Sequence, residues 1–365
     1  MKNIMKTMLV ALISFSFSSV AQSGDLQITG SAKASYGIVS SDGTAAKQEI
    51  GKSLGVTNEF SLKASGELDN GMTWAYAQDI DGATAQDDGK LTLTTDYGTL
   101  GVFISEGGLD ADNAASQSVI SRPSDTSFGE DMVDSWDLSG TNTIQYHTPS
   151  DLLPYGTTVK IAFAPANGTA AINDYKASGA ANTGSFTAAT TDATSATPFG
   201  QGARMGTHAT HFRVDTEPKA GLKVGADYVD FSGVVGATDQ KPESGSVYAT
   251  YTQGIVSVGV SRNYLATALA MANADGENFL EAITGTKGSV AVNVNDDLSI
   301  SLEREVSSPT FTNDSTENKM VSDGIQAAYT MGGMTLAIAR NSHENAQYTK
   351  DQDVHDTVFS VAMAF

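Results

Sequence analysis

Residues 60–76, FSLKASGELDNGMTWAY, decide the fold that the sequence predicts. Apolar and polar residues alternate from Phe60 to Leu68, which is the period of a strand with one apolar and one polar face. Asp69-Asn70-Gly71 then supplies the Asn-Gly pair that is typical of a tight hairpin turn. Beyond the turn, apolar residues return at every second position as far as Tyr76. The stretch therefore predicts two antiparallel strands joined by a short turn.

The same plan recurs along the chain. Residues 290–302 alternate on both sides of Asn295-Asp296-Asp297, and residues 321–338 do so around Met331-Gly332-Gly333. The connections on the other side of each strand are long and rich in Asp, Asn, Ser, Thr, Gly and Ala. They are 39–55, 78–89, 104–141, 166–206, 232–244, 266–285, 307–319 and 341–353. We interpret 166–206, which has low sequence complexity, as an external loop.

The alternation of tight turns and long polar loops predicts an all-β protein, a transmembrane antiparallel β-barrel. Seven turns between eight loops give about sixteen strands, an even number as such barrels use. The alternatives are a soluble β-sandwich and a β-helix. Either would leave many two-faced strands without a partner for one face, whereas a barrel with lipid outside and water inside satisfies both faces.

Composition excludes several classes of protein. The chain of 365 residues has no cysteine, so a disulfide scaffold, a thiolate metal site and a cysteine nucleophile are excluded. It has 42 Asp+Glu against 21 Lys+Arg, a net charge of −21, which disfavours a nucleic-acid partner. After the first twenty residues no apolar run approaches the roughly 18 residues that a membrane-spanning helix needs.

The first segment has the pattern of a signal peptide. Lys2 and Lys6 precede an apolar stretch at 8–17, and Ser19-Val20-Ala21 offers small residues for cleavage. An N-terminal anchor is the alternative, although the stretch is short for a span. We predict that residues 1–21 are removed on export and that 22–365 form the barrel, in the envelope of a bacterium.

Four segments make the chain similar to the Gram-negative general porin family over its whole mature length. Residues 68–76 resemble the first periplasmic hairpin of the family, 96–101 the strands before its third loop, and 142–149 the strand after that loop. The alternating C-terminal strand, with Phe359 and the final Phe365, resembles the signal that the barrel-assembly machinery reads. The resemblance implies a homotrimer in the outer membrane, a third loop folded into the pore, and passive diffusion of small hydrophilic solutes and ions.

The third loop, residues 104–141, is acidic and has Arg122 as its only base. Its Phe128-Gly129-Glu130-Asp131 resembles the constriction motif of the family. Ser127 stands where a carboxylate commonly precedes the Phe-Gly pair, so Asp125 is an alternative source of charge. About half of the loop acids are expected only to solvate the loop. The candidates for an acidic pore constriction are Glu106, Asp110, Asp112, Asp125, Glu130, Asp131 and Asp134.

Basic residues on the barrel wall are expected to face these acids. Strand parity places Lys33, Lys63 and Lys90 in the lumen, as it does Lys160, Arg213, Lys223 and Lys287. Ile104-Ser105 and Gln145 stand where relatives often carry Arg, so the wall has less positive charge than is usual in the family. We therefore predict a pore with a weak preference for cations.

Three arginines, Arg262, Arg304 and Arg340, have outward parity and each follows an outward apolar series. They are candidates to bind lipopolysaccharide phosphates, which suit the arginine fork. The alternative is that each strand has already left the membrane there, or that a bulge reverses the parity. On the first strand, the small outward residues Gly30, Ala32 and Ala34 are the candidate contact between subunits.

The sequence offers no motif of an enzyme and no metal motif. His208 and His211 lie on opposite faces of a strand and cannot share a metal. No cofactor is expected, apart from weak Ca²⁺ binding by the acids of 79–82 or 110–113. Two other functions stay open: a porin specific for one class of solute, and a barrel that acts as an adhesin or receptor through its loops.

Overall fold

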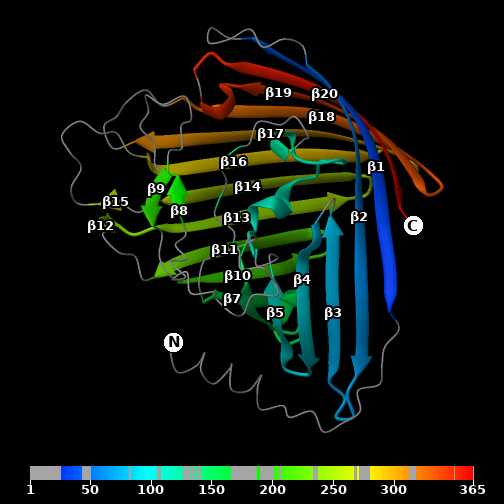
Figure 1. Cartoon of the computed structure of the whole chain (residues 1–365), viewed down its shortest axis with the longest axis vertical. Helices are drawn as coiled ribbons and strands as arrows, with labels where there is room; N and C mark the ends of the chain where they lie inside the picture. The colour runs from blue at the N-terminus through cyan, green and yellow to red at the C-terminus, as the bar shows by residue number, and fades with distance from the viewer. Residues whose placement is uncertain are drawn as a thin grey trace.

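The computed structural model of this chain describes residues 26–42, 51–81, 84–104, 108–125, 132, 135, 138, 141–165, 187–189, 201–204, 208–232, 237–266, 269–270, 280–311, 318–348 and 350–364. Sixteen of its strands form one closed barrel (Figure 1). They are β1 (Gln27–Asp42), β2 (Gly51–Glu67), β3 (Thr73–Asp81), β4 (Thr84–Thr95), β5 (Gly98–Ile104), β6 (Thr143–His147), β7 (Thr158–Ala164), β10 (His208–Lys219), β11 (Leu222–Ser232), β13 (Glu243–Gln253), β14 (Val256–Ala266), β16 (Leu280–Asn293), β17 (Leu298–Phe311), β18 (Met320–Met331), β19 (Met334–Glu344) and β20 (Asp353–Ala364).

The barrel closes where its first and last strands meet. β20 pairs antiparallel with β1 (Figure 1). In this pairing Phe359 lies opposite Tyr36. Every other barrel strand pairs antiparallel with the barrel strands before and after it in the chain. The predicted sixteen-stranded antiparallel barrel is therefore confirmed.

Short turns gather at one end of the barrel. In the β2–β3 turn, Gly71 has a φ of 80°, a conformation that glycine adopts without strain. In the β16–β17 turn, the Oδ1 atom of Asn295 accepts hydrogen bonds from the N–H groups of Asp297 and Leu298, both at 2.9 Å. The β6–β7 connection, residues 148–157, is longer than the other turns and contains the 3-10 helix η3 (Pro154–Gly156).

The long connections at the other end contain structure that the sequence did not predict. β8 (Thr187–Ala189) pairs with β9 (Gln201–Arg204) inside the segment interpreted as an external loop. β12 (Ala237–Gln240) pairs with β15 (Leu269–Ala270). Each pair is short, so its sequence carries too few alternating residues to mark a strand.

The two faces of the barrel wall differ in polarity. On β14, Val256, Val258 and Val260 are exposed on the outside, whereas Ser261 and Asn263 point inward and are buried. β17 repeats the pattern with Leu302 outside and Glu303 inside. A strand with such faces is stable between lipid and a polar interior. Within the residues that the structure describes, no helix is long and apolar enough to cross a membrane.

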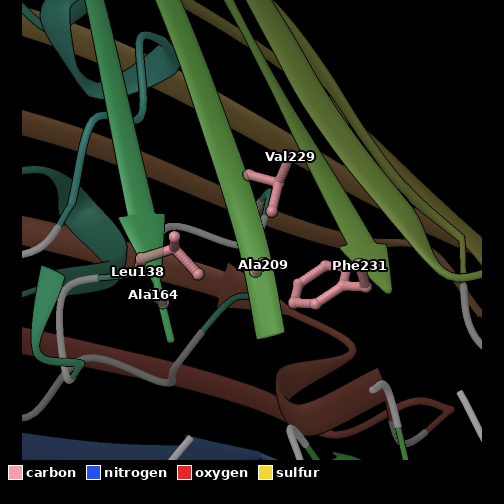
Figure 2. Packing of buried hydrophobic residues seen from close by; sticks show 5 residues of the cluster. All are labelled: Leu138, Ala164, Ala209, Val229 and Phe231. Carbon is pink, nitrogen blue, oxygen red and sulfur yellow. The ribbon is translucent and has the colours of Figure 1, made fainter. Parts of the chain in front are cut away.

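An apolar cluster lies inside the barrel near the end with the long connections. Leu138, from the connection between β5 and β6, packs with four residues of β7, β10 and β11 (Figure 2). These four are Ala164, Ala209, Val229 and Phe231, and all are almost fully buried. The cluster fixes the C-terminal part of that connection against the inner wall.

Candidate functional site

The candidate site is the part of the β5–β6 connection that runs inside the barrel, residues 108–125, called here the inner loop. It contains the 3-10 helices η1 (Asp112–Ala115) and η2 (Pro123–Asp125). Its polar partners are inward-facing side chains from β10 to β18. The inner loop therefore lies along one side of the lumen.

The first contact holds η1 to the wall. The backbone N–H of Ala111 donates to Asp227 Oδ1 at 2.8 Å. Lys287 Nζ donates to Asp112 Oδ2 at 2.7 Å, and both side chains are at most 2% exposed. Since an isolated buried charge is costly, each partner stabilises the other at this position.

Serines and an amide hold the middle of the inner loop. The hydroxyls of Ser116 and Ser118 donate to Glu303 Oε2 at 2.5 and 2.6 Å. The N–H of Val119 donates to Ser301 Oγ at 3.0 Å, and the N–H of Ile120 donates to Gln326 Oε1 at 2.9 Å. Backbone groups that would otherwise be unpaired in a loop are thus satisfied by the wall.

The third contact involves η2. Arg122 donates from Nε and Nη2 to the two carboxylate oxygens of Asp125, at 2.8 and 2.9 Å. Its Nη1 atom lies 3.6 Å from Glu305 Oε1. The N–H of Ser124 donates to Glu305 Oε2 at 3.0 Å. Arg122 therefore lies between an acid of the inner loop and an acid of the wall.

Two glycines let the inner loop approach the wall closely. A Cβ atom at Gly259 would lie 1.8 Å from the carbonyl oxygen of Ala115, far inside van der Waals contact. One at Gly324 would lie 2.6 Å from Cγ of Pro123. At Gly259 the loop backbone lies directly on the backbone of the barrel, and at Gly324 the ring of Pro123 does so.

The loop acids that the sequence singled out differ in their surroundings. Asp112 is buried against Lys287, so its charge is compensated. Asp125 pairs with Arg122 and keeps a side chain that is 50% exposed. The backbone oxygen of Asp110 accepts a hydrogen bond from Arg213 Nη1 at 2.5 Å. The other candidates lie outside the described residues: Glu106, Glu130, Asp131 and Asp134.

The candidate basic wall lies across the barrel from the inner loop. Lys63 and Lys90 occur in one inward row with Ala77 between them, and Lys33 faces inward on β1. In the closed order of sixteen strands, β2 is eight strands from β13, which is halfway around the barrel. β13 lies among the strands from β10 to β18 that contact the inner loop. Acids share this wall, since Ser61 Oγ hydrogen-bonds to Asp79 Oδ1 there.

Sequence reasoning missed the wall residues that hold the inner loop. Asp227, Glu303, Glu305 and Gln326 are buried and face inward. A signal was present, because Glu303 and Glu305 have the inward parity of a strand whose outward positions are apolar. The same parity that predicts the inward lysines therefore also predicts that Glu303 and Glu305 face the lumen.

The two histidines discarded as metal ligands lie on opposite faces, as predicted. His211 is buried and inward, with Nε2 at 3.1 Å from Asp227 Oδ2. His208 contacts the Phe163 ring on the outer side. Among the described residues, no group of three or more His, Asp or Glu is placed to hold a metal ion. One acid in each of the two candidate Ca²⁺ segments has a protein partner. In 79–82, Asp79 accepts a hydrogen bond from Ser61, and in 110–113, Asp112 pairs with Lys287.

The outward residues follow the predicted parity. Arg304 is exposed, with Nη1 at 3.4 Å from Asp323 Oδ2, and Arg340 Nη1 donates to Thr357 Oγ1 at 2.8 Å. Arg262 is exposed on β14. Arg304 and Arg340 line a shallow groove on the outer face that includes Gly288 and Ile325. Arg262 lies beside this groove, because its partner on β16 is Thr286, two residues from Gly288. Phe359 is also outward, whereas Phe365 lies outside the described residues.

No protein-family model and no curated protein matches the chain. Solved structures match over nearly its whole length. One is OmpF of Salmonella typhi in complex with daunomycin, with a TM-score of 0.61 and 12% identity, covering 94% of this chain and 98% of that chain. An anion-selective porin from Comamonas acidovorans has a TM-score of 0.58 and 11% identity, covering 93% of this chain and 100% of that chain.

A third similar structure is a loop-deletion mutant of OmpT, an outer membrane protein of Vibrio cholerae. Its TM-score is 0.58 at 11% identity, and the match covers 94% of this chain and 99% of that chain. Identities this low establish the fold alone. The chain therefore has the sixteen-stranded porin fold of Gram-negative outer-membrane barrels, and the resemblance predicted from the sequence is confirmed at that level.

Proposed function

We propose that the protein is a general porin of the Gram-negative outer membrane, which lets small hydrophilic solutes and ions diffuse passively through its lumen. The observation that carries this proposal is the inner loop, whose backbone and side chains hydrogen-bond to inward residues of the wall. A polar loop fixed to one side narrows a water-filled barrel without filling it with apolar side chains.

A weak preference for cations is part of the proposal. The bases near the inner loop are paired with acids, as in Lys287–Asp112 and Arg213–Asp215. The wall acid Glu303 instead accepts hydrogen bonds from two serine hydroxyls, and Glu305 and Asp125 share the single base Arg122. Negative charge therefore exceeds positive charge on this side of the lumen, which raises the local concentration of cations.

The test is planar-bilayer conductance of the purified protein, with the zero-current potential measured under a KCl gradient. We expect a stable conductance and a potential of cationic sign. Absence of conductance would contradict the pore and favour an adhesin or receptor. Block by a low concentration of one solute would favour a porin specific for that solute class.

We further propose a homotrimer, whose subunits contact one another through the outer face of β1. Ala32 and Ala34 give that face little relief, and a shallow outer groove runs from Ala34 to Leu336 and Phe359. Cross-linking in the membrane, compared between wild type and Ala32→Arg, tests this contact. The proposal also includes export of the chain through the signal peptide at residues 1–21. The barrel-assembly machinery would then recognise the C-terminal strand through Phe359 and Phe365.

The outward arginines are proposed to bind lipopolysaccharide phosphates. Tyr228 and Tyr264 lie level with each other on the outer face, since both are opposite Gly245. Arg262 is the next outward residue to Tyr264 on β14, and tyrosines at such positions are typical of the membrane interface. Replacing Arg262, Arg304 and Arg340 with Gln is expected to reduce the gain in thermal stability that added lipopolysaccharide gives. An unchanged gain would contradict this partner.

A further inference from the structure

The β6–β7 connection is the one turn among the described short connections that exposes several large apolar side chains. Leu152 is 61% exposed, Tyr155 69% and Leu153 37%. Its only charged residue is Asp151. The β2–β3 turn, Asp69-Asn70-Gly71, is polar by comparison. An exposed patch of this kind needs a partner other than water.

Hydrogen bonds fold this connection against the outside of the barrel. Thr216 has outward parity, because its partner in β11 is Val224 and its neighbour Val214 is exposed on the outer face. Thr216 Oγ1 donates to the backbone oxygen of Tyr155 at 3.4 Å. Thr157 Oγ1 donates to Thr216 Oγ1 at 2.9 Å. The helix η3 therefore lies beside the outer face of β10 and not beneath the lumen.

The backbone of Tyr155 is in a conformation that such a residue rarely adopts. Its φ is 61° and its ψ is 29°, the left-handed region that glycine or asparagine usually occupies. Neighbouring Pro154 restricts the chain further. A tyrosine kept in this region, with its ring in the open, points to a function for the side chain.

We propose that Leu152, Leu153 and Tyr155 form an anchor that inserts into the boundary between headgroups and acyl chains of the leaflet at the turn end of the barrel. The partner is the lipid surface, because the patch continues the outward apolar face of β7 and β10, where Val159 pairs with Val214. Tyrosine and leucine suit this boundary, since an apolar body can enter the lipid while a polar group stays wet. The inference rests on the proposed membrane location.

The test uses the absence of cysteine from the chain, which allows a single label at any chosen position. Leu152→Cys carries an environment-sensitive fluorophore in vesicles that contain phospholipids brominated near the headgroup. Asn70→Cys, in the polar β2–β3 turn, is the matched control at the same end of the barrel. Leu302→Cys, on the outer face, reports whether the barrel is in the bilayer.

We expect quenching by the brominated lipid at Leu302→Cys and at Leu152→Cys, but not at Asn70→Cys. Lipids brominated near the acyl end should quench Leu302→Cys more than Leu152→Cys. Quenching at Leu302→Cys with none at Leu152→Cys overturns the anchor and leaves the porin proposal intact. An apolar emission at Leu152→Cys without lipid quenching also overturns it, because a second subunit or another protein would then cover the patch. Lack of quenching at Leu302→Cys contradicts the membrane location itself.

Discussion

At the scale of single residues, the buried ion pair Asp112–Lys287 joins the inner loop to the wall. Both side chains are at most 2% exposed, so removing one partner leaves the other charge buried without its closest counter-charge. Asp112→Leu or Lys287→Met alone should cost about 3–5 kcal/mol, and the double variant Asp112→Leu with Lys287→Met much less. Unfolding of the detergent-solubilised barrel by denaturant measures the loss of unfolding free energy in the two single variants and the double variant. Additive costs would show that the two charges do not interact.

The substitution Gly259→Ala tests whether the inner loop lies against the wall as closely as the structure shows. A Cβ atom there would lie 1.8 Å from the oxygen of Ala115, so Gly259→Ala must displace η1 towards the lumen. The overpacking should cost about 1–3 kcal/mol, and the single-channel conductance should fall because the loop moves into the passage.

Gly288→Ala is the control for Gly259→Ala. A Cβ at Gly288 meets nothing within 4 Å, and the residue faces outward on β16. Its conductance should equal that of the wild type. Equal conductance of all three proteins would mean that the inner loop does not rest on Gly259 in the membrane.

At the scale of elements, the C-terminal part of the β5–β6 connection depends on Leu138. Its side chain is 1% exposed and packs on β7, β10 and β11 (Figure 2). Leu138→Ala should cost about 2–5 kcal/mol of local stability, because the cavity that it leaves cannot close on a rigid wall. Limited proteolysis should then cut the connection faster, while the strands stay resistant. Cleavage at the wild-type rate would contradict the role of Leu138.

The sequence was sufficient for elements whose information is local. The β2–β3 hairpin followed from alternation and from Asn70-Gly71, and the structure has it at the predicted place. The contacts of the inner loop were not accessible in this way. Asp112 and Lys287 are 175 residues apart in the chain, so only the closed barrel brings them together. Parity could indicate that Lys287 faces inward, but not which loop residue reaches it.

At the scale of the whole molecule, the lumen has two unlike sides. One is the inner loop with the paired charges of β10 to β18, and the other carries Lys33, Lys63 and Lys90. Charges in a water-filled passage are screened over about 8 Å at physiological salt, so the lysines act on ions that pass near them. They should therefore weaken the cation preference without abolishing it.

Replacing Lys33 and Lys63 with Gln removes positive charge from the lumen only. The zero-current potential under a KCl gradient should shift further in the cationic direction, and the shift should shrink when salt is raised on both sides. Arg304→Gln is the matched control, because it removes a positive charge from the outer face, where Arg304 pairs with Asp323. Its potential should equal that of the wild type. If the lysine variant leaves the potential unchanged, or if Arg304→Gln shifts it equally, ions do not pass along the wall that carries these lysines.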